Sequence, residues 1–435
     1  MHGLELRCGV LIGLLTLASA APGWGQATAR SAALEGIGRL DPTPAATLLL
    51  PYFEVDLADV AGIVTVFTLH NADAADHIAH VVVWSDLGVP VLDFNVYLTG
   101  YDTEFINVRF VLEGSLPFTA PPDVHASASP VGPLSVSNPD LDTTSCAGQL
   151  PPFTLPFSFV QHLQASLTGE PSELFGGACF GVDHGDQVAR GYITVDVVRS
   201  CSLLFPGDPG YFVDGGQGIA TNENVLWGDF QIVEPAADRA LSAPLVHLEA
   251  HGSVAGGFWA AGDPTFYGTY VGGTAIDNRE PLAFAWVSRF LGDGVAFDDT
   301  DLVWWRDPGQ EVSPFTCGQI PSPFPLGQRS ALVFDDQEDF VERSDAQPFP
   351  WTVTRASVAA DLVSPFIFGW VLLDHPGQSF LLTWIDPRGR FTSGHEAIPL
   401  DNALAPLGEV PEPPGLVFAD GFESGDFSAW SAVVP

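Results

Sequence analysis

The stretch VLDFNVYLTG, residues 91–100, alternates apolar and polar side chains with a period of two. Leu92, Phe94, Val96 and Leu98 share one face, and the other face carries Asp93, Asn95, Tyr97 and Thr99. Successive side chains of a β-strand point to opposite faces of a sheet, so this alternation predicts a strand with one buried face and one polar face.

The neighbouring stretches indicate that this strand belongs to an antiparallel sheet. TEFINVRFVL (103–112) alternates in the same way, with Ile106, Val108, Phe110 and Leu112 on its apolar face. GIVTVFTLHN (62–71) and HIAHVVVWSD (77–86) are rich in β-branched and aromatic residues and are separated by a polar turn. No helical pattern intervenes, which favours an all-β sandwich over a parallel α/β fold.

This region resembles the immunoglobulin-like accessory modules of bacterial surface and secreted proteins. The resemblance rests on a strand that ends at Asn71, on SDLGVP (85–90) and on the alternating strand that follows. It implies a structural or spacing module and assigns no catalytic residue.

Strand patterns resume after residue 188, and they predict a second, larger β-sandwich region. One helix is predicted in LPFSFVQHLQASLTG (155–169), where Phe159, Leu163 and Leu167 share a face and Gly169 can end the helix. The predicted organisation is a signal peptide at 1–27, an immunoglobulin-like sandwich at 46–118, a linker or long loop at 119–145, a disulfide-containing sandwich region at 146–400, a proline-rich linker at 401–415 and a tail at 416–435.

The charge composition excludes several classes of partner. Of 435 residues, 53 are acidic and 15 are basic, every base is an arginine, and the formal net charge is −38. A field of this sign repels nucleic acids and anionic lipid surfaces. We expect no nucleic-acid partner; an extracellular glycan or protein remains a possible partner.

The first residues have the layout of a secretory signal peptide. Arg7 precedes an apolar run from Cys8 to Ala21, and small residues follow it. No later stretch approaches twenty consecutive apolar residues, so no membrane span is expected in the mature chain. The expected location is secreted or extracellular, with the cell surface and the periplasm as variants.

Four cysteines lie beyond the expected signal peptide, Cys146, Cys179, Cys201 and Cys317. An even number in an exported chain predicts two disulfides. Three pairings are possible; we favour Cys146–Cys179, which closes a local loop, together with Cys201–Cys317.

The candidate metal ligands are His247, Glu249 and His251 in the segment HLEAH. On a strand, residues two apart project from the same face, so two imidazoles and a carboxylate would converge there, as zinc, iron or manganese sites require. The alternative is a solvent-facing polar stripe on a strand whose other face packs inward.

Calcium is the other candidate cofactor. The acidic loops FDDTD (297–301) and FDDQED (334–339) offer carboxylates without the spacing of an EF-hand. A further cluster, Asp183, His184, Asp186 and Arg190, is interpreted as a turn in which Arg190 pairs locally.

These patterns point to a secreted, non-enzymatic β-sandwich protein with a structural, adhesive or ligand-binding role. The alternatives are an extracellular glycan-active hydrolase, which needs only two suitably spaced carboxylates, and a metal-dependent exported protein. The segment DGFESGDFSAWS (420–431) resembles a short tail of secreted bacterial proteins, and we interpret it as a terminal recognition tag.

Overall fold

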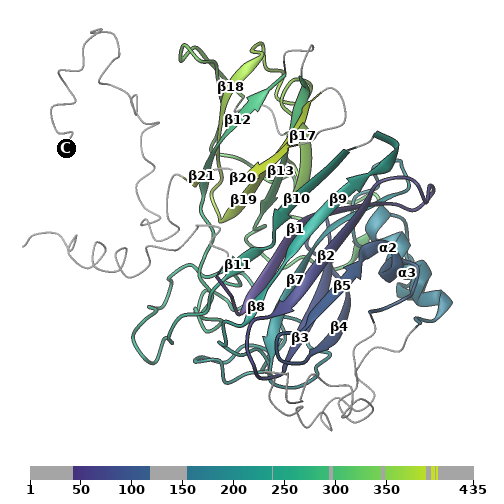
Figure 1. The fold of residues 1–435 in the computed structure, drawn as a ribbon, viewed down its shortest axis with the longest axis vertical. Coiled ribbons are helices and arrows are strands. Elements are labelled where there is room, and N and C mark those ends of the chain that lie inside the picture. The colour runs from purple at the N-terminus through teal and green to yellow at the C-terminus, as the bar shows by residue number, and fades with distance from the viewer. Residues whose placement is uncertain are drawn as a thin grey trace, which may run out of the picture. The chain divides into compact units, whose positions relative to one another are not determined.

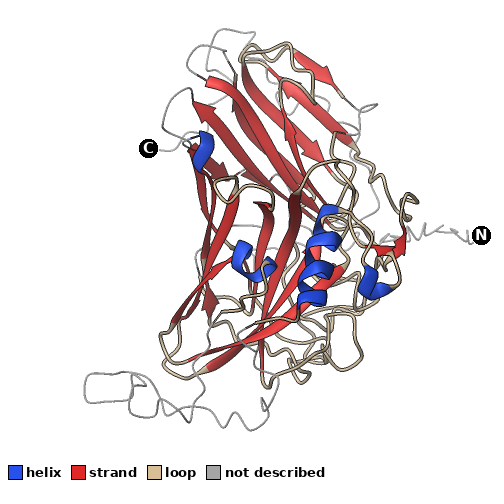
Figure 2. Cartoon of the chain, turned by 90° about the vertical axis from the view of Figure 1, so that its right-hand side faces the viewer, coloured by secondary structure: helices blue, strands red, loops and turns tan. Residues whose placement is uncertain are grey.

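The computed structural model describes residues 43–117, 154–237, 239–292, 297–343, 348–387, 393–396 and 398–399. In these residues the fold is all-β, and the ladders between strands are antiparallel (Figures 1 and 2). Four of the five sheets in these residues form two sandwiches, one from strands before residue 249 and one from strands after residue 284.

The first sandwich contains two five-stranded sheets that pack face to face. One sheet has the order β11-β1-β7-β3-β4, formed by Val246–Leu248, Thr47–Asp56, Val188–Val198, His77–Ser85 and Pro90–Leu98. The other has the order β10-β9-β2-β5, formed by Arg239–Pro244, Asp229–Glu234, Val64–Asn71 and Thr103–Asn107, with β8 (Leu226–Trp227) also paired to β2.

The second sandwich is built in the same way from later residues. One sheet has the order β16-β15-β18-β12-β21, formed by Phe340–Glu342, Ser330–Phe334, Phe368–Asp374, Ala285–Leu291 and Ile398–Pro399. The facing sheet has the order β17-β13-β19-β20, formed by Val353–Ser357, Phe297–Arg306, Ser379–Pro387 and Ser393–Glu396. Buried apolar residues of both sandwiches belong to one contiguous core, to which Leu48 and Trp304 both contribute.

The strands expected in a separate immunoglobulin-like module at 46–118 do not form one. Strand β1 pairs with β7 and β11, and β2 pairs with β9, so the early strands share both sheets with residues 188–248. A sequence pattern shows where strands lie, whereas the choice of partner depends on contacts far away in the chain. The predicted boundary at 119–145 therefore falls within one sandwich, and that segment itself lies outside the described residues.

The alternating stretch at 91–100 forms strand β4, but the face that carries its polar side chains is largely buried rather than solvated. Asn95 is fully buried and its amide donates to the carbonyl of Ser202 at 2.9 Å. Tyr97 is also buried, and its hydroxyl donates to Asp76 at 2.8 Å. Loop residues after β7 cover this face. Cys201 of that loop forms a small apolar cluster with Ile78, Tyr97 and Val198.

The prediction for residues 103–112 is half right. Strand β5 ends at Asn107, whose side chain accepts a hydrogen bond from the backbone N–H of Arg109 and starts the short helix α2, Val108–Leu112. The helix turns Phe110 outward, where it is 55% exposed, and buries Arg109, which donates to backbone carbonyls including that of Asp56. Because Asn107 caps the start of a helix, residues 108–112 are helical although the stretch 103–112 has the alternating pattern of a strand.

The predicted helix is confirmed as α3, Phe157–Thr168. Gly169 ends it with a left-handed conformation at φ 81°, and a Cβ at this position would lie 2.1 Å from the backbone N of Asp183. Glycine is therefore required there both for backbone conformation and for space. Two 3-10 turns, Glu173–Phe175 and Pro235–Ala237, complete the described helical residues.

The favoured disulfide pairing is wrong. Cys179 is bonded to Cys317, 138 residues away in the sequence. The short strands β6 (Ala178–Cys179) and β14 (Phe315–Thr316) pair and bring the two cysteines together. Cys201 is also disulfide-bonded, to a cysteine outside the described residues. Cys146 lies outside the described residues.

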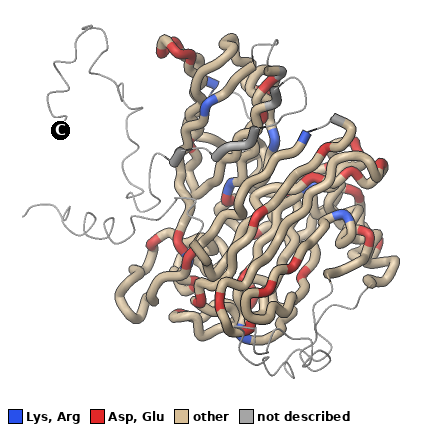
Figure 3. Tube along the Cα trace, in the orientation of Figure 1, with Lys and Arg blue, Asp and Glu red and all other residues tan. Residues whose placement is uncertain are grey.

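The described chain carries few positive charges among many negative ones, as the tube coloured by charge shows (Figure 3). In the same residues no helix is both long enough and apolar enough to cross a membrane.

Candidate metal centre

Two of the three predicted metal ligands, Glu249 and His251, meet a third acid that the sequence did not single out, Glu280. Potential ligand atoms of these three residues lie within 4.8 Å of one another. The Nε2 atom of His251 is 3.7 Å from Oε2 of Glu249 and 3.8 Å from Oε2 of Glu280. We refer to these three residues as the Glu–His–Glu centre.

A short antiparallel pairing of the chain with itself creates this centre. The N–H of Glu280 donates to the carbonyl of Glu249 at 2.9 Å, and the N–H of His251 donates to the carbonyl of Asn278 at 2.9 Å. Ala250 lies opposite Arg279 in the same pairing. Because side chains alternate across a strand, Glu249, His251 and Glu280 share one face, while Ala250 and Arg279 share the other.

His247 does not join the centre. It lies within β11, opposite Leu48 of β1, and its side chain is 4% exposed. Its Nε2 atom accepts from the backbone N–H of Gly228 at 3.4 Å. The strand ends at Leu248, so the alternation that relates Glu249 to His251 does not extend back to His247.

The spacing of the centre is compatible with a bound cation as well as with ion pairs between His251 and the two glutamates. Distances of 3.7 and 3.8 Å exceed those of charge-assisted hydrogen bonds, which are about 2.7–2.9 Å. Ligands around a tetrahedral ion with bonds of about 2.1 Å are separated by roughly 3.4 Å. Small side-chain adjustments would therefore bring one nitrogen and two oxygens to a common cation.

Burial and charge make the metal-free centre bind protons more readily, so a cation has to displace protons from it. The Glu280 side chain is 6% exposed, and burial raises the pKa of its carboxyl. The Glu280 carboxylate, assisted by Glu249, raises the pKa of His251. A cation here would neutralise two adjacent carboxylates, one of which is almost fully removed from water.

Neighbouring groups fix the orientation of two ligands. The Oε1 atom of Glu280 accepts from the backbone N–H of Glu249 at 3.0 Å, which leaves Oε2 directed at His251. The His251 ring stacks on Phe258 with centroids 5.6 Å apart, and the indole N–H of Trp259 donates to the His251 carbonyl. Oriented ligands of this kind are a property of protein metal sites.

Behind the centre, Arg279 is fully buried and anchors the segment that carries Glu280. Its guanidinium donates to the Thr47 hydroxyl at 3.0 Å, to the carbonyl of Thr221 at 2.7 Å, and to both Asn222 and the carbonyl of Asp277. One nitrogen also lies 3.8 Å from the buried carboxylate of Asp196. The hydroxyl groups of Tyr211 and Tyr267 donate to that carboxylate at 2.8 and 2.9 Å.

A nearby buried acid, Asp277, provides a pH-dependent prediction. Burial raises its pKa to about 6, although its Oδ2 atom accepts from the backbone N–H of Tyr267. Because the folded pKa exceeds the unfolded value, the folded state binds more protons, and stability falls as pH rises through that pKa.

We therefore expect Asp277→Asn to raise the free energy of unfolding by about 2–3 kcal/mol at pH 8 and to change it little at pH 3.5. An amide keeps an oxygen for the Tyr267 N–H and remains neutral. Urea unfolding of both proteins at the two pH values measures the difference. An equal effect at both pH values would show that Asp277 is not a raised-pKa carboxyl.

The other acidic clusters are occupied by the protein's own groups. Asp301 pairs with Arg355, and Asp299 accepts from the Ser357 hydroxyl. Asp335 accepts backbone N–H groups from Gln337 and Asp339 within its turn. Within the described ranges, only the Glu–His–Glu centre gathers three potential metal-binding side chains.

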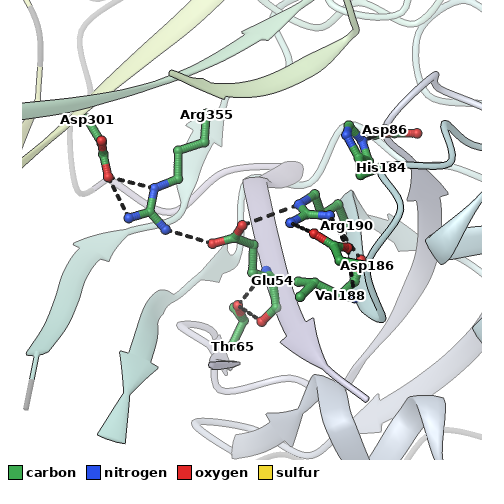
Figure 4. Close-up of polar contacts among 9 residues, drawn as sticks. All are labelled: Glu54, Thr65, Asp86, His184, Asp186, Val188, Arg190, Asp301 and Arg355. Atoms are coloured by element: carbon green, nitrogen blue, oxygen red, sulfur yellow. Dashed lines mark hydrogen bonds and ion pairs between the residues drawn. The ribbon is translucent and has the colours of Figure 1, made fainter. Parts of the chain in front are cut away.

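The cluster at 183–190 takes part in structural ion pairs (Figure 4). Arg190 binds Asp186 through two hydrogen bonds of 2.8 and 2.9 Å, as the local-pairing interpretation predicts. His184 contacts Asp86 at 2.9 Å. Glu54 links the two sandwiches, because it contacts both Arg190 and Arg355.

An aromatic pocket between the sandwiches does not contain the paired acids of a glycosidase. Its lining includes Trp84, Tyr192, Tyr270, Trp305 and one carboxylate, Asp307. Burial raises the pKa of Asp307, and Thr269 and Gln378 both donate to it. Glycoside hydrolysis requires a second carboxylate, which this lining lacks.

His251 and Glu249 were accessible to sequence analysis through their spacing of two residues. Glu280 was not, because the segment IDNREPL carries no metal-binding pattern and reaches the centre only through its pairing with residues 249–251. No protein-family model, curated protein sequence or solved structure gives a significant match to the chain.

Proposed function

We propose that this chain is an exported, non-enzymatic β-sandwich protein that binds one divalent first-row cation at the Glu–His–Glu centre. Its role would be that of a structural, adhesive or ligand-binding component outside the cell. The observation that carries the proposal is the convergence of Glu249, His251 and Glu280 on one face of a paired segment.

The chemistry of the donors selects the class of cation. One imidazole nitrogen and two carboxylate oxygens suit Zn²⁺, Mn²⁺ or Fe²⁺, whereas Ca²⁺ prefers an all-oxygen set. Three protein ligands leave at least one coordination position for water or for a group of a partner. The cation would also tie residues 249–251 to residue 280 and so stabilise the loop between them.

Export is supported by two features. The N-terminal residues 1–27 have the layout of a signal peptide, and the described residues contain a disulfide. Residues 416–435 add the proposed recognition tag. Fractionation of cells that express the chain with and without residues 1–27 tests export, and equal cytoplasmic retention of both would contradict it.

Metal titration of residues 28–435 tests the function directly. We expect one equivalent of Zn²⁺ or Mn²⁺ to bind, and Ca²⁺ at the same concentration not to displace it. At a free metal concentration 100 times Kd, binding adds about 2.7 kcal/mol to stability, so the Tm should rise with metal and fall after chelation. A Tm that is indifferent to metal and to chelator, with no stoichiometric binding, would contradict the proposal.

A glycan-active hydrolase is the second candidate, because Glu249 and Glu280 bring two carboxylates together in different environments. The Glu280 side chain is 6% exposed and that of Glu249 is 32% exposed. Paired carboxylates of unequal burial are the groups that glycosidases use. Turnover of polysaccharides that is lost in Glu249→Gln would favour this candidate over the first.

A further inference from the structure

On the outer face of one sheet of the second sandwich, a row of aromatic side chains crosses the adjacent strands β16, β15 and β18. Trp370 of β18 lies opposite Phe334 of β15, and Phe334 lies opposite Phe340 of β16. Phe334 and Phe340 are in contact, with ring centroids 5.7 Å apart. Phe368 precedes Trp370 by two residues and points to the same side. We call these four residues the aromatic row.

The aromatic row is exposed to an extent that is unusual for such residues. Phe340 is 59% exposed, Trp370 45% and Phe368 42%. Ile367, which directly precedes Phe368 in the chain, is also exposed. Contiguous exposed apolar surface of this kind marks a binding surface in soluble proteins.

A single positive charge continues the row on β12. Arg289 lies opposite Trp370 and is exposed. Within the described part of the chain, its guanidinium makes no hydrogen bond and no ion pair, whereas the other described arginines each contact a carboxylate or a carbonyl, for example Arg329 with Asp374. In a chain with 53 acids, an unpaired arginine beside exposed aromatics indicates a site for an acidic, aromatic segment.

We propose that residues 416–431 of the same chain, LVFADGFESGDFSAWS, bind to the aromatic row. This segment interleaves Phe418, Phe422, Phe427 and Trp430 with Asp420, Glu423 and Asp426, and it contains no base. Its aromatic rings can stack on the exposed rings of the sheet, and its carboxylates can pair with Arg289, which lies at the end of the row away from the acidic turn Asp335–Asp339. One stretch of sixteen residues therefore supplies both aromatic rings for the row and carboxylates for Arg289.

The linker that joins the sheet to residues 416–431 is long enough for this segment to reach the aromatic row. The last described strand, β21 (Ile398–Pro399), pairs with β12 in the same sheet. Sixteen residues, 400–415, separate it from the segment, and even a stiff proline-rich linker spans about 3.1 Å per residue, or roughly 50 Å. Four strands are only about 15 Å wide. A linker of this length holds the segment at an effective concentration of about 1 mM.

Charge disfavours the competing occupant, a second copy of the chain. Two molecules of formal charge −38 repel each other, and each would bring its own acidic turn, Asp335–Asp339, to the contact. The tethered segment is also acidic, but its tether offsets the repulsion and only three carboxylates approach the sheet.

Site-specific photocrosslinking of the full chain tests this proposal. The photoreactive residue p-benzoylphenylalanine replaces Phe340 in one variant and Phe105 in a matched control, since Phe105 is 58% exposed on β5 of the other sandwich. At low micromolar protein, we expect crosslinks within one molecule from position 340 to residues 416–431, and none to this segment from position 105. Peptide mass spectrometry identifies the crosslinked residues.

Two further variants show whether the crosslink depends on the aromatic rings of the segment and on Arg289. Replacing Phe422, Phe427 and Trp430 together by serine should abolish the crosslink while keeping the length and charge of the segment. Arg289→Gln should lower its yield about two- to five-fold, as expected for an exposed ion pair. Crosslinks to a second copy, crosslinks to another part of the chain, or an unchanged yield in the triple serine variant would each overturn the proposal.

Discussion

Arg279→Leu is expected to lower the free energy of unfolding by about 3–5 kcal/mol, the cost of removing one partner from a buried ion pair. The guanidinium and the Asp196 carboxylate that it faces are both completely buried. Its loss also leaves the Thr221 and Asp277 carbonyls without a donor. The hydroxyl groups of Tyr211 and Tyr267 still satisfy Asp196, which keeps the expected loss within this range.

The matched control is Arg343→Leu, which removes a more exposed arginine that donates to the Val363 carbonyl. We expect the control to change stability by no more than about 0.5–1 kcal/mol. Guanidinium chloride unfolding of the three proteins gives the comparison. A loss below 1 kcal/mol for Arg279→Leu would show that the buried network does not hold this part of the fold together.

The second large effect is expected on metal affinity. Glu280→Gln should weaken binding of Zn²⁺ or Mn²⁺ about 100-fold or more, because loss of a ligand costs at least as much as loss of the groups that orient ligands. A glutamine oxygen can still accept from the Glu249 N–H, so the local pairing is preserved. Removing a buried carboxylate should leave the metal-free protein at least as stable as before.

A second histidine with two carboxylates provides the control for this variant. His77 contacts Asp73 through Nε2 at 3.2 Å and Glu223 through Nδ1 at 3.7 Å. Its acids lie at different ring nitrogens, so they do not converge on one ion. Isothermal titration should show unchanged affinity in Glu223→Gln; equal weakening in both variants would mean that binding reflects general negative charge.

The sequence was sufficient for the fold class because period-two alternation depends only on local burial. The stretch at 91–100 is a strand as predicted, yet its second face is buried by the loop that carries Ser202. Nothing local to the strand reports which distant segment covers it. For the same reason, local sequence does not show that β1 pairs with β7 and β11, or that Cys179 bonds to Cys317.

The candidate centre was predictable in part for a similar reason. Glu249 and His251 are two residues apart, so their common face follows from strand geometry alone. Glu280 comes from a segment 31 residues from Glu249, and its position depends on the pairing that Arg279 anchors from behind. His247 lies apart from Glu249 and His251 because β11 ends at Leu248, and the alternation of a single strand does not continue across that end.

The central claim, that Glu249, His251 and Glu280 hold one cation, is tested most directly by anomalous diffraction. Crystals of residues 28–435 grown with Zn²⁺ would be measured above and below the zinc absorption edge. We predict one anomalous peak about 2.0–2.2 Å from Nε2 of His251 and from one oxygen of each glutamate. A fully occupied zinc elsewhere, with this position empty at saturating metal, would contradict the account.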